Sequence, residues 1–340
     1  MSSQVSPALY ILRANHMKPF LDKFNEIGSP IESQLNKVGL ASGMFDDPND
    51  FVFEHAVWRF IGNTAKLEGV QELGFLVTES ATLPDYGEFG RLIVSAPNLF
   101  QALNIFIDKM SLQSNCLGYW LEECDDYLWI CRPGVPSFDV GSWQVEQHVL
   151  SFIIQIIQHF LGSNWKPHFV KLQSEETLGY EFYKSLRNVP YTNGCRYTSI
   201  PVLKRDLPTQ NTNSDIESGF LPSMNPAPLG FVNTLKQLMH QGYFGVEIKQ
   251  LDVAESVFMN ERTLKRRLQA CDTNFRSILA EVQYEKAIHL MSFGNHDIAD
   301  IAIELGFKHP NNFSRAFKAW CGITPSEYVN LKNNSESIIL

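Results

Sequence analysis

The spacing of apolar residues changes along the chain and divides it into parts that are built differently. The first hundred or so residues follow mainly a helical period, as in the stretch after Pro97, where Asn98 is placed to cap a helix with one apolar face. Two short apolar runs, 116–121 and 127–131, flank the acidic sequence EECDD, which indicates a hairpin with its turn in water. Further short strands are predicted in WKPHFVKLQS and GCRYTSIPVLKRDL. The N-terminal part is therefore predicted to be an α+β domain.

A strongly apolar helix is predicted within this domain, from Val149 to Leu161. Two interpretations of this helix remain open. The favoured one is a core or dimer helix with a solvent-exposed edge, and the other is a helix whose polar stripe lines a ligand pocket. Its 13 residues are the longest apolar run and fall short of the ~20 that a membrane span needs, so no membrane partner is expected. The polar residues fall on one side at spacings of three and four, and are Ser151, Gln155, Gln158 and His159.

One segment has neither a helical nor a strand period. From Lys204 to Gly230 the chain is rich in Pro, Asn, Ser and Thr, which predicts a linker. We therefore expect an α+β domain for effector binding or dimerisation over residues 1–205, a linker over 206–229 and an all-α domain over 230–335.

Beyond the linker, the sequence contains an internal duplication. The copies are QLDVAESVFMNERTLKRRLQA and DIADIAIELGFKHPNNFSRAFKAW. In each, a short helix with a small residue, Ala254 or Ala302, precedes a turn and a second helix, as in a helix-turn-helix unit. Between the copies, FRSILAEVQYEKAIHLMS predicts a linker helix of roughly 27 Å, comparable with the ~34 Å between successive major grooves on one side of a DNA duplex.

Charge is distributed unevenly over these parts. The chain has 28 Lys and Arg against 37 Asp and Glu, a formal charge of −9, which argues against coating nucleic acid by bulk positive charge. Residues 1–229 hold 16 basic and 25 acidic side chains, whereas residues 230–340 hold 12 of each. Cationic outer faces on two short helices suit docking in the major groove. The cations that we expect to point outward are Arg262, Lys265, Arg266, Arg267 and Arg276 in the first unit, and Lys308, Arg315 and Lys318 in the second.

Residues from about 236 to 332 resemble the DNA-binding domain of the AraC/XylS family of bacterial transcription regulators. The resemblance rests on VAESVFMNERTLKRRL, on the linker helix and on IADIAIELGFKHPNNFSRAFKAWCGITPSEYV. Arginine can bind guanine through two hydrogen bonds, and asparagine can bind adenine in the same way. The resemblance implies that the residues in contact with DNA are Arg262, Lys265, Arg266, Asn311, Asn312 and Arg315, with Lys318 near a phosphate.

Gly306 suits the positive φ that the second turn demands, and Pro310 suits the first turn of a helix. Two positions depart from the family pattern. Phe258 stands in the first unit where the second has Gly306, which leaves the geometry of that turn open. Gln283 in the linker helix stands where the family usually carries arginine, which removes an expected charge.

Residues 20 to 208 resemble the N-terminal domain, labelled arabinose-binding-like, of AraC-type regulators of ornithine and arginine catabolism and of virulence. The resemblance rests on VSAPNLFQALNIFIDKM, WKPHFVKLQ and RYTSIPVLKRDLP. The family label does not establish a sugar ligand, and the effector-binding residues are not predicted. The 24 phenylalanines would allow an apolar or amphipathic effector, and they are equally what a packed core contains.

No catalytic, cofactor or metal site is predicted from the sequence. It has no phosphate loop and no HExxH, GxSxG or GxGxxG motif, and its six cysteines include no CxxC pair. The favoured interpretation of the cysteines at 116, 124 and 131 is small apolar residues in strands, with redox sensing as the alternative. An enzyme fused to a DNA-binding domain is a second hypothesis, but no nucleophile with a partnered base supports it.

The sequence thus predicts a transcription regulator that binds specific promoter DNA and is not an enzyme. The resemblance to the AraC/XylS family favours activation of transcription over repression and implies contact with RNA polymerase. The N-terminal domain is expected to form a homodimer or to sense a small molecule. A cytoplasmic location is expected, because the N-terminus lacks the pattern of a secretion signal.

Overall fold

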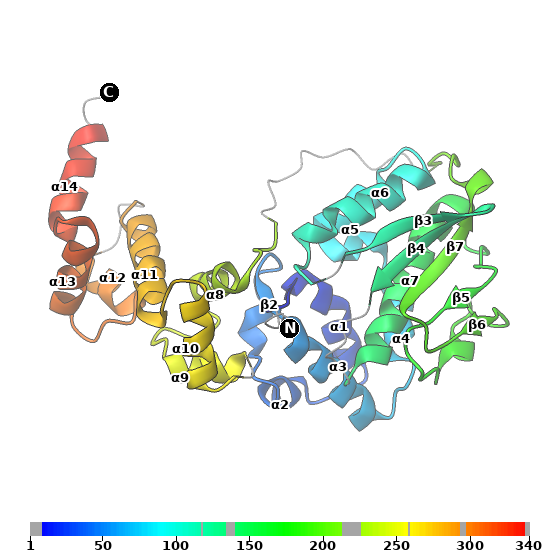
Figure 1. The fold of residues 1–340 in the computed structure, drawn as a ribbon, viewed down its shortest axis with the longest axis horizontal. Coiled ribbons are helices and arrows are strands. Elements are labelled where there is room, and N and C mark those ends of the chain that lie inside the picture. The colour runs from blue at the N-terminus through cyan, green and yellow to red at the C-terminus, as the bar shows by residue number, and fades with distance from the viewer. Residues whose placement is uncertain are drawn as a thin grey trace. The chain divides into compact units, whose positions relative to one another are not determined.

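The computed structural model describes residues 9–116, 118–133, 140–212, 226–257, 259–292 and 297–336. They form two compact units, Tyr10–Ala227 and a second unit that comprises Leu9 and the described residues from Pro228 onward. The first contains helices and two sheets, and the described residues of the second are helical outside their loops (Figure 1). The predicted fold class, an α+β domain followed by an all-α domain, is confirmed.

The first unit opens with a small antiparallel sheet of β1 (Ile11–Arg13) and β2 (Phe51–Phe53). Asn98 caps α6 as predicted, because its side-chain oxygen accepts a hydrogen bond of 2.9 Å from the backbone N–H of Gln101. The helices of this part are α1 (Lys18–Glu26), α2 (Ile31–Asn36), α3 (Glu54–Glu68), α4 (Leu73–Glu79), α5 (Gly87–Val94) and α6 (Leu99–Lys109).

A five-stranded sheet has the order β3-β4-β7-β5-β6. The predicted hairpin is present, but its turn is shorter than the acidic run, because Glu122 and Glu123 are exposed at the edge of the sheet and stay hydrated as members of β3. The strand predicted around WKPHFVKLQS is only two residues long. The strands are β3 (Trp120–Cys124), β4 (Tyr127–Pro133), β5 (Val170–Lys171), β6 (Tyr191–Thr192) and β7 (Tyr197–Leu203).

The long helix α7 (Ser142–Leu161) begins seven residues before the predicted start, since polar residues interrupt the apolar pattern of its first two turns. It is a core helix, as the favoured interpretation has it, and its polar edge is partly exposed at Gln155, Gln158 and His159. The alternative of a stripe that lines a pocket is not supported, because none of these residues lines the cavity described below. The Ser151 hydroxyl is buried and donates a 2.7 Å hydrogen bond to Thr78 in α4. The Gln155 amide donates to the carbonyls of Thr78 and Ala81. The stripe therefore joins α7 to α4 and the residues after it.

A buried carboxylate fixes α7 to the sheet region. Glu146 is 3% exposed and accepts hydrogen bonds from the backbone N–H groups of Gln173 and Ser174, at 2.8 and 2.9 Å, and from the Thr198 hydroxyl. A buried carboxyl group of this kind is tolerated because three donors replace its hydration.

Part of the segment between the predicted domains contacts the first unit. The backbone N–H groups of Leu99 and Phe100 donate to the carbonyls of Thr209 and Leu207, and the Asn211 amide donates to the carbonyls of Val94 and Ala96. Further along the predicted linker, residues 213–225 lie outside the described residues, and the backbone N–H of Ala227 donates to the Ser111 carbonyl.

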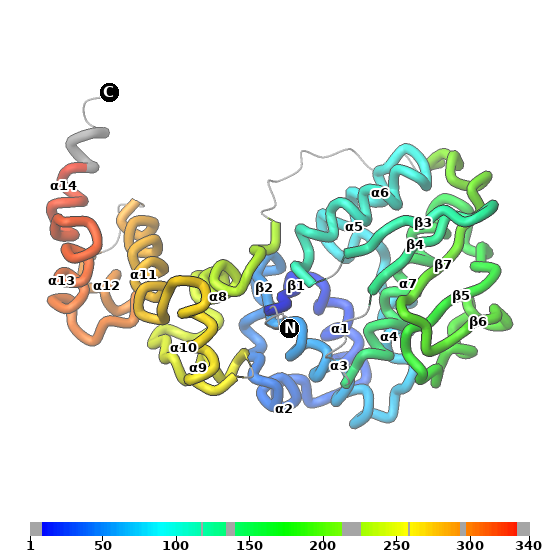
Figure 2. Tube along the Cα trace, viewed as in Figure 1, coloured from blue at the N-terminus to red at the C-terminus, as the bar shows by residue number. Residues whose placement is uncertain are grey.

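The second unit contains two pairs of short helices with a long helix between them along the chain (Figure 2). The linker helix α11 has the bounds that the sequence predicts. Among the described residues, every helix is too short or too polar to span a bilayer. The helices of the second unit are α8 (Phe231–His240), α9 (Gln250–Ser256), α10 (Glu261–Ala270), α11 (Phe275–Ser292), α12 (Ile298–Glu304), α13 (Pro310–Cys321) and α14 (Pro325–Glu336).

Candidate functional site

The two helix pairs, α9–α10 and α12–α13, share the same hydrogen bond at the turn. The backbone N–H of Met259 donates to the Ala254 carbonyl at 2.8 Å, and that of Phe307 donates to the Ala302 carbonyl at 2.9 Å. Both alanines are fully buried, so a larger side chain there would separate the helices. The internal duplication of the sequence is thus a duplication of structure.

Apolar residues at i, i+4 hold the second helix of each pair in place. Leu264 and Leu268 of α10 are buried, as are Phe313 and Phe317 of α13, which contact each other edge to face with centroids 5.7 Å apart. Burying an aromatic side chain of this size stabilises the fold by roughly 2–3 kcal/mol. These residues are core, which directs the polar positions of α10 and α13 outward.

The second turn depends on Gly306, whose φ of +82° is the predicted positive value. A Cβ at this position would lie 2.4 Å from the Val246 carbonyl oxygen, so any side chain would also force backbone to move. Pro310 stands at the start of α13, as predicted. The corresponding position of the first turn, Phe258, lies outside the described residues.

All seven residues predicted to contact DNA are exposed on the second helices of the two units. Arg262, Lys265 and Arg266 lie on α10, and the other four lie on α13: Asn311, Asn312, Arg315 and Lys318. The Arg315 guanidinium donates a 2.7 Å hydrogen bond to the Asn312 side-chain oxygen, which restrains a long side chain at the surface. The structure therefore gathers cations and amides on one helix of each unit.

Arg267 is a correction to the predicted outward cations, because it is 8% exposed. Its guanidinium lies over the Phe231 ring of α8, 4.4 Å from the centroid, and donates to the Met259 sulfur at 3.6 Å. The reason is spacing: Arg267 follows Leu264 by three residues and so shares its buried face. Arg267 holds α10 to α8 in place of facing DNA.

Polar side chains attach helix α11 to the α12–α13 pair and to helix α8. The Gln283 amide donates a 2.9 Å hydrogen bond to the Leu305 carbonyl in the second turn. Towards α8, His240 contacts Glu285 at 2.6 Å and Lys236 forms an ion pair with Glu281. From the sequence, Gln283 stood out only because it removes a charge that the family usually has. In the structure it orients the α12–α13 pair on the linker helix.

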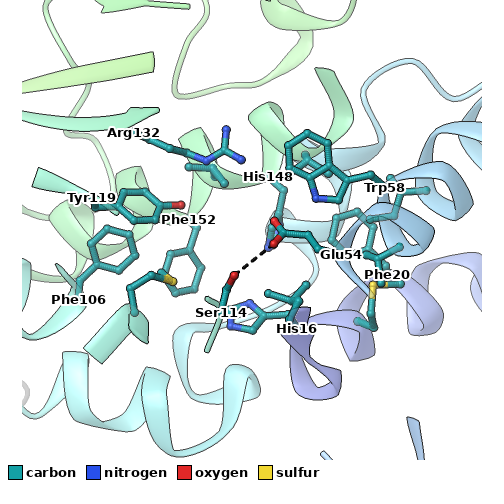
Figure 3. Close-up of a pocket in the computed structure, with 17 residues that line it drawn as sticks. His16, Phe20, Glu54, Trp58, Phe106, Ser114, Tyr119, Arg132, His148 and Phe152 are labelled. Carbon is teal, nitrogen blue, oxygen red and sulfur yellow. Dashed lines mark hydrogen bonds between the residues drawn. The ribbon is translucent and has the colours of Figure 1, made fainter. Parts of the chain in front are cut away.

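A cavity of about 70 Å³ lies within the first unit, between α1, α3, α6, β4 and α7 (Figure 3). Arg132 and Tyr119 enter it from one side, and Glu54 and Trp58 enter from another. The Ser114 hydroxyl donates to the Glu54 carboxylate at 3.2 Å. Its lining is Leu12, His16, Met17, Phe20, Glu54, Val57, Trp58, Ile61, Phe106, Met110, Ser114, Tyr119, Arg132, Val145, His148, Val149 and Phe152.

Burial changes the protonation of the ionisable groups in this cavity. It raises the pKa of Glu54 to about 7, against the opposing effect of Arg132 and of hydrogen bonds from neighbouring side chains. It lowers the pKa of His16 to about 4 and that of His148 to about 3, so both rings are neutral at pH 7. The Nε and Nη2 atoms of Arg132 are buried without a hydrogen-bond partner.

No motif in the sequence predicts this site. The available signal was a charged residue inside an apolar run, as in FVFEHAVW around Glu54 and YLWICRPGV around Arg132. The cysteines add no reactive group here, because burial raises the pKa of the Cys116 thiol well above its usual range and that of Cys131 to about 12.

An all-α unit with two helix-turn-helix pairs, in one chain with an α+β unit that holds a cavity, is the architecture of a DNA-binding transcription regulator. Residues 253–330 match the model of a helix-turn-helix domain. Residues 28–210 match the model of the arabinose-binding domain of AraC transcription regulators.

Sequence similarity to known regulators points to the same class of protein. An uncharacterized HTH-type transcriptional regulator of Mycobacterium tuberculosis is 39% identical over 321 residues, which cover 89% of this chain and 92% of that protein. The virulence regulon transcriptional activator VirF of Shigella flexneri is 22% identical over 185 residues, 54% of this chain and 66% of VirF. The ornithine utilization regulator of Pseudomonas aeruginosa is 32% identical over 75 residues, 22% of each chain. The chain therefore belongs to the AraC family of transcription regulators.

Proposed function

We propose that this regulator reads a specific promoter sequence with α10 and α13 inserted in adjacent major grooves of one DNA duplex. The proposed contact residues are Arg262, Lys265, Arg266, Asn311, Asn312, Arg315 and Lys318. The observation that carries the proposal is the exposure of these cations and amides on the second helix of each duplicated unit. The 18-residue helix α11 supports simultaneous docking, since its length of roughly 27 Å approaches one turn of DNA.

Fluorescence anisotropy of the full-length protein on labelled promoter fragments tests sequence-specific binding. We expect affinity for one fragment to exceed that for random DNA by a factor of roughly 10³ or more at physiological salt. Equal affinity for all fragments would refute specific reading.

The spacing of the bound sequence tests the use of both units. Inserting five base pairs between the two half-elements of the site turns one groove to the opposite face of the duplex. We expect this insertion to weaken binding strongly, whereas an insertion of ten base pairs, which restores the face, is the matched control for added length. Equal binding to the unmodified site and to the site with five inserted base pairs would mean that only one helix-turn-helix pair reads DNA.

Arg315→Ala separates base contact from phosphate contact. We expect a loss of roughly 1–3 kcal/mol on the specific sequence and relaxed preference at one base position. Arg205→Ala removes an exposed arginine of the first unit and serves as the control. A loss that is equal on all sequences would make Arg315 a phosphate contact.

We further propose that the first unit dimerises and senses a small molecule, and that the second unit activates transcription through RNA polymerase in the cytoplasm. The cavity supports sensing because it combines apolar walls with a few polar groups, as small-molecule sites do. The relative named as a transcriptional activator supports activation. Native mass spectrometry of the full-length protein tests both properties of the first unit: a monomer without copurified ligand, at concentrations that bind DNA, would contradict this role.

A further inference from the structure

The cavity of the first unit contains a buried cation with unused hydrogen-bonding capacity. Arg132 is 2% exposed, and its Nε and Nη2 atoms have no hydrogen-bond partner. The guanidinium contacts the Tyr119 hydroxyl, and its Cζ lies 5.6 Å from the Trp58 ring centroid. These contacts leave one edge of the guanidinium unused, because Nε and Nη2 point their N–H groups to the same side. That edge is the one that matches the two oxygens of a carboxylate.

The other groups of the cavity do not neutralise this cation fully. Burial raises the pKa of Glu54 to about 7, so near neutral pH the carboxyl group is protonated in a large fraction of molecules. Among the described residues that line the cavity, His16 and His148 add no charge at pH 7, because burial lowers the pKa of both. A buried, partly uncompensated guanidinium is unfavourable, and a bound anion would remove that penalty.

The other side chains that line the cavity determine which kind of ligand chain can bind. Aromatic and aliphatic side chains dominate the lining, among them Phe20, Phe106 and Phe152. The available volume of about 70 Å³ corresponds to roughly five waters, which suits a small molecule. A pentose fits less well than an apolar chain, because the apolar part of the lining would leave some of the hydroxyls around its ring without hydrogen bonds.

We propose that this cavity binds a short monocarboxylate with an apolar chain. Its carboxylate accepts hydrogen bonds from Nε and Nη2 of Arg132, and its chain lies among Phe106, Phe152 and the aliphatic residues of α3 and α7. The proposal deepens the effector-sensing role proposed above and rests on it, and it gives that role a chemical class and an anchoring residue.

Isothermal titration calorimetry with the full-length protein tests this assignment, with hexanoate as the probe. Hexan-1-ol has the same chain without the anion, and L-arabinose represents the pentose class. We expect hexanoate to bind roughly ten- to a hundredfold more tightly than hexan-1-ol, the range expected for a charge-assisted pair of hydrogen bonds. Tighter binding of L-arabinose, or equal binding of hexanoate and the alcohol, would overturn the proposal.

Variants locate the site without depending on DNA. Arg132→Met keeps most of the side-chain length and should abolish the preference for hexanoate while retaining binding of the alcohol. Arg132→Lys should keep the preference in weakened form, because it retains charge but not the planar fork. Arg205→Met changes an exposed arginine of the same unit and should bind hexanoate as the parent protein does. Unchanged hexanoate affinity in Arg132→Met would refute the assignment.

Anisotropy on promoter DNA with the same protein samples distinguishes failure of the cavity assignment from failure of the proposed reading of DNA. Hexanoate binding without any specific DNA binding would sustain the cavity assignment and refute the proposed reading of DNA. Specific DNA binding without hexanoate binding would do the reverse.

Discussion

Replacing Glu54 by glutamine should remove a pH-dependent loss of stability from the first unit. Glu54 is 2% exposed, and burial raises its pKa from the ordinary 4.5 to about 7. Between these values the unfolded chain ionises this carboxyl group while the folded protein keeps it protonated. The unfolded state then binds fewer protons, so the free energy of unfolding falls as pH rises through this window.

The magnitude follows from the two pKa values. One pKa unit corresponds to about 1.4 kcal/mol, so the difference between 4.5 and about 7 amounts to roughly 3 kcal/mol, fully developed above pH 7. Glutamine has no charge to desolvate and can still accept the hydrogen bond from Ser114. The stability of Glu54→Gln relative to the parent protein should therefore increase by roughly 3 kcal/mol between pH 4.5 and pH 8.

Urea unfolding at several pH values, followed by tryptophan fluorescence, measures this difference. Five of the six tryptophans, at 58, 120, 129, 143 and 165, lie in the first unit, so the signal reports mainly on its unfolding. His16 and His148 act in the opposite direction. Their lowered pKa values give stability that is present above 6.5 and is lost as pH falls towards about 4 and 3, but both proteins share it.

Glu32→Gln, at an exposed glutamate of the same unit, is the matched control and should show no such trend. A Glu54→Gln difference that stays constant from pH 4.5 to pH 8 would refute the argument, since it would mean that Glu54 ionises in the folded protein as it does in the unfolded chain.

Two further predictions concern the second unit. Gly306→Ala should destabilise it by roughly 2–4 kcal/mol in thermal unfolding followed by circular dichroism, because it combines a strained positive φ with a Cβ 2.4 Å from the Val246 carbonyl oxygen. Gly322→Ala, which has a similar φ and open space, should lose only about 1–2 kcal/mol, and equal losses would exclude the close approach as a cause. Arg267→Met should lower stability with little effect on intrinsic DNA affinity, whereas Arg262→Met should lower DNA affinity and leave stability within about 0.5 kcal/mol. The reverse pattern would place Arg267 at the DNA.

The second unit could be predicted almost residue by residue because its structure is determined locally. The helical period gives the buried positions of α10 and α13, and the predicted bounds of α11 agree with the structure. Arg267 departs from the predicted outward cations because its position on the helix, and not its charge, decides which way it faces. Its three-residue separation from Leu264 is visible in the sequence and would have placed it on the inner face.

The first unit could be predicted less well because its contacts join distant segments. Strands β5 and β6 have two residues each and are defined by pairing, not by a period of their own. The cavity brings together His16, Glu54, Ser114, Arg132 and His148, which are up to 132 positions apart in the chain. No local pattern relates them, so only a charged residue within an apolar run hinted at the site.

The structure also explains how a helical unit with equal numbers of acids and bases presents positive recognition helices. The acids Glu281 and Glu285 of α11 lie against Lys236 and His240 of α8, and Glu247 lies near Lys308. These acidic side chains contact basic side chains of the same unit, and all three lie outside α10 and α13. Helix α13 contains no acidic residue and α10 contains one, so their cations are not offset along their own helices. The net charge of the unit is therefore a poor guide to its interaction with phosphates, which depends on where the charges lie.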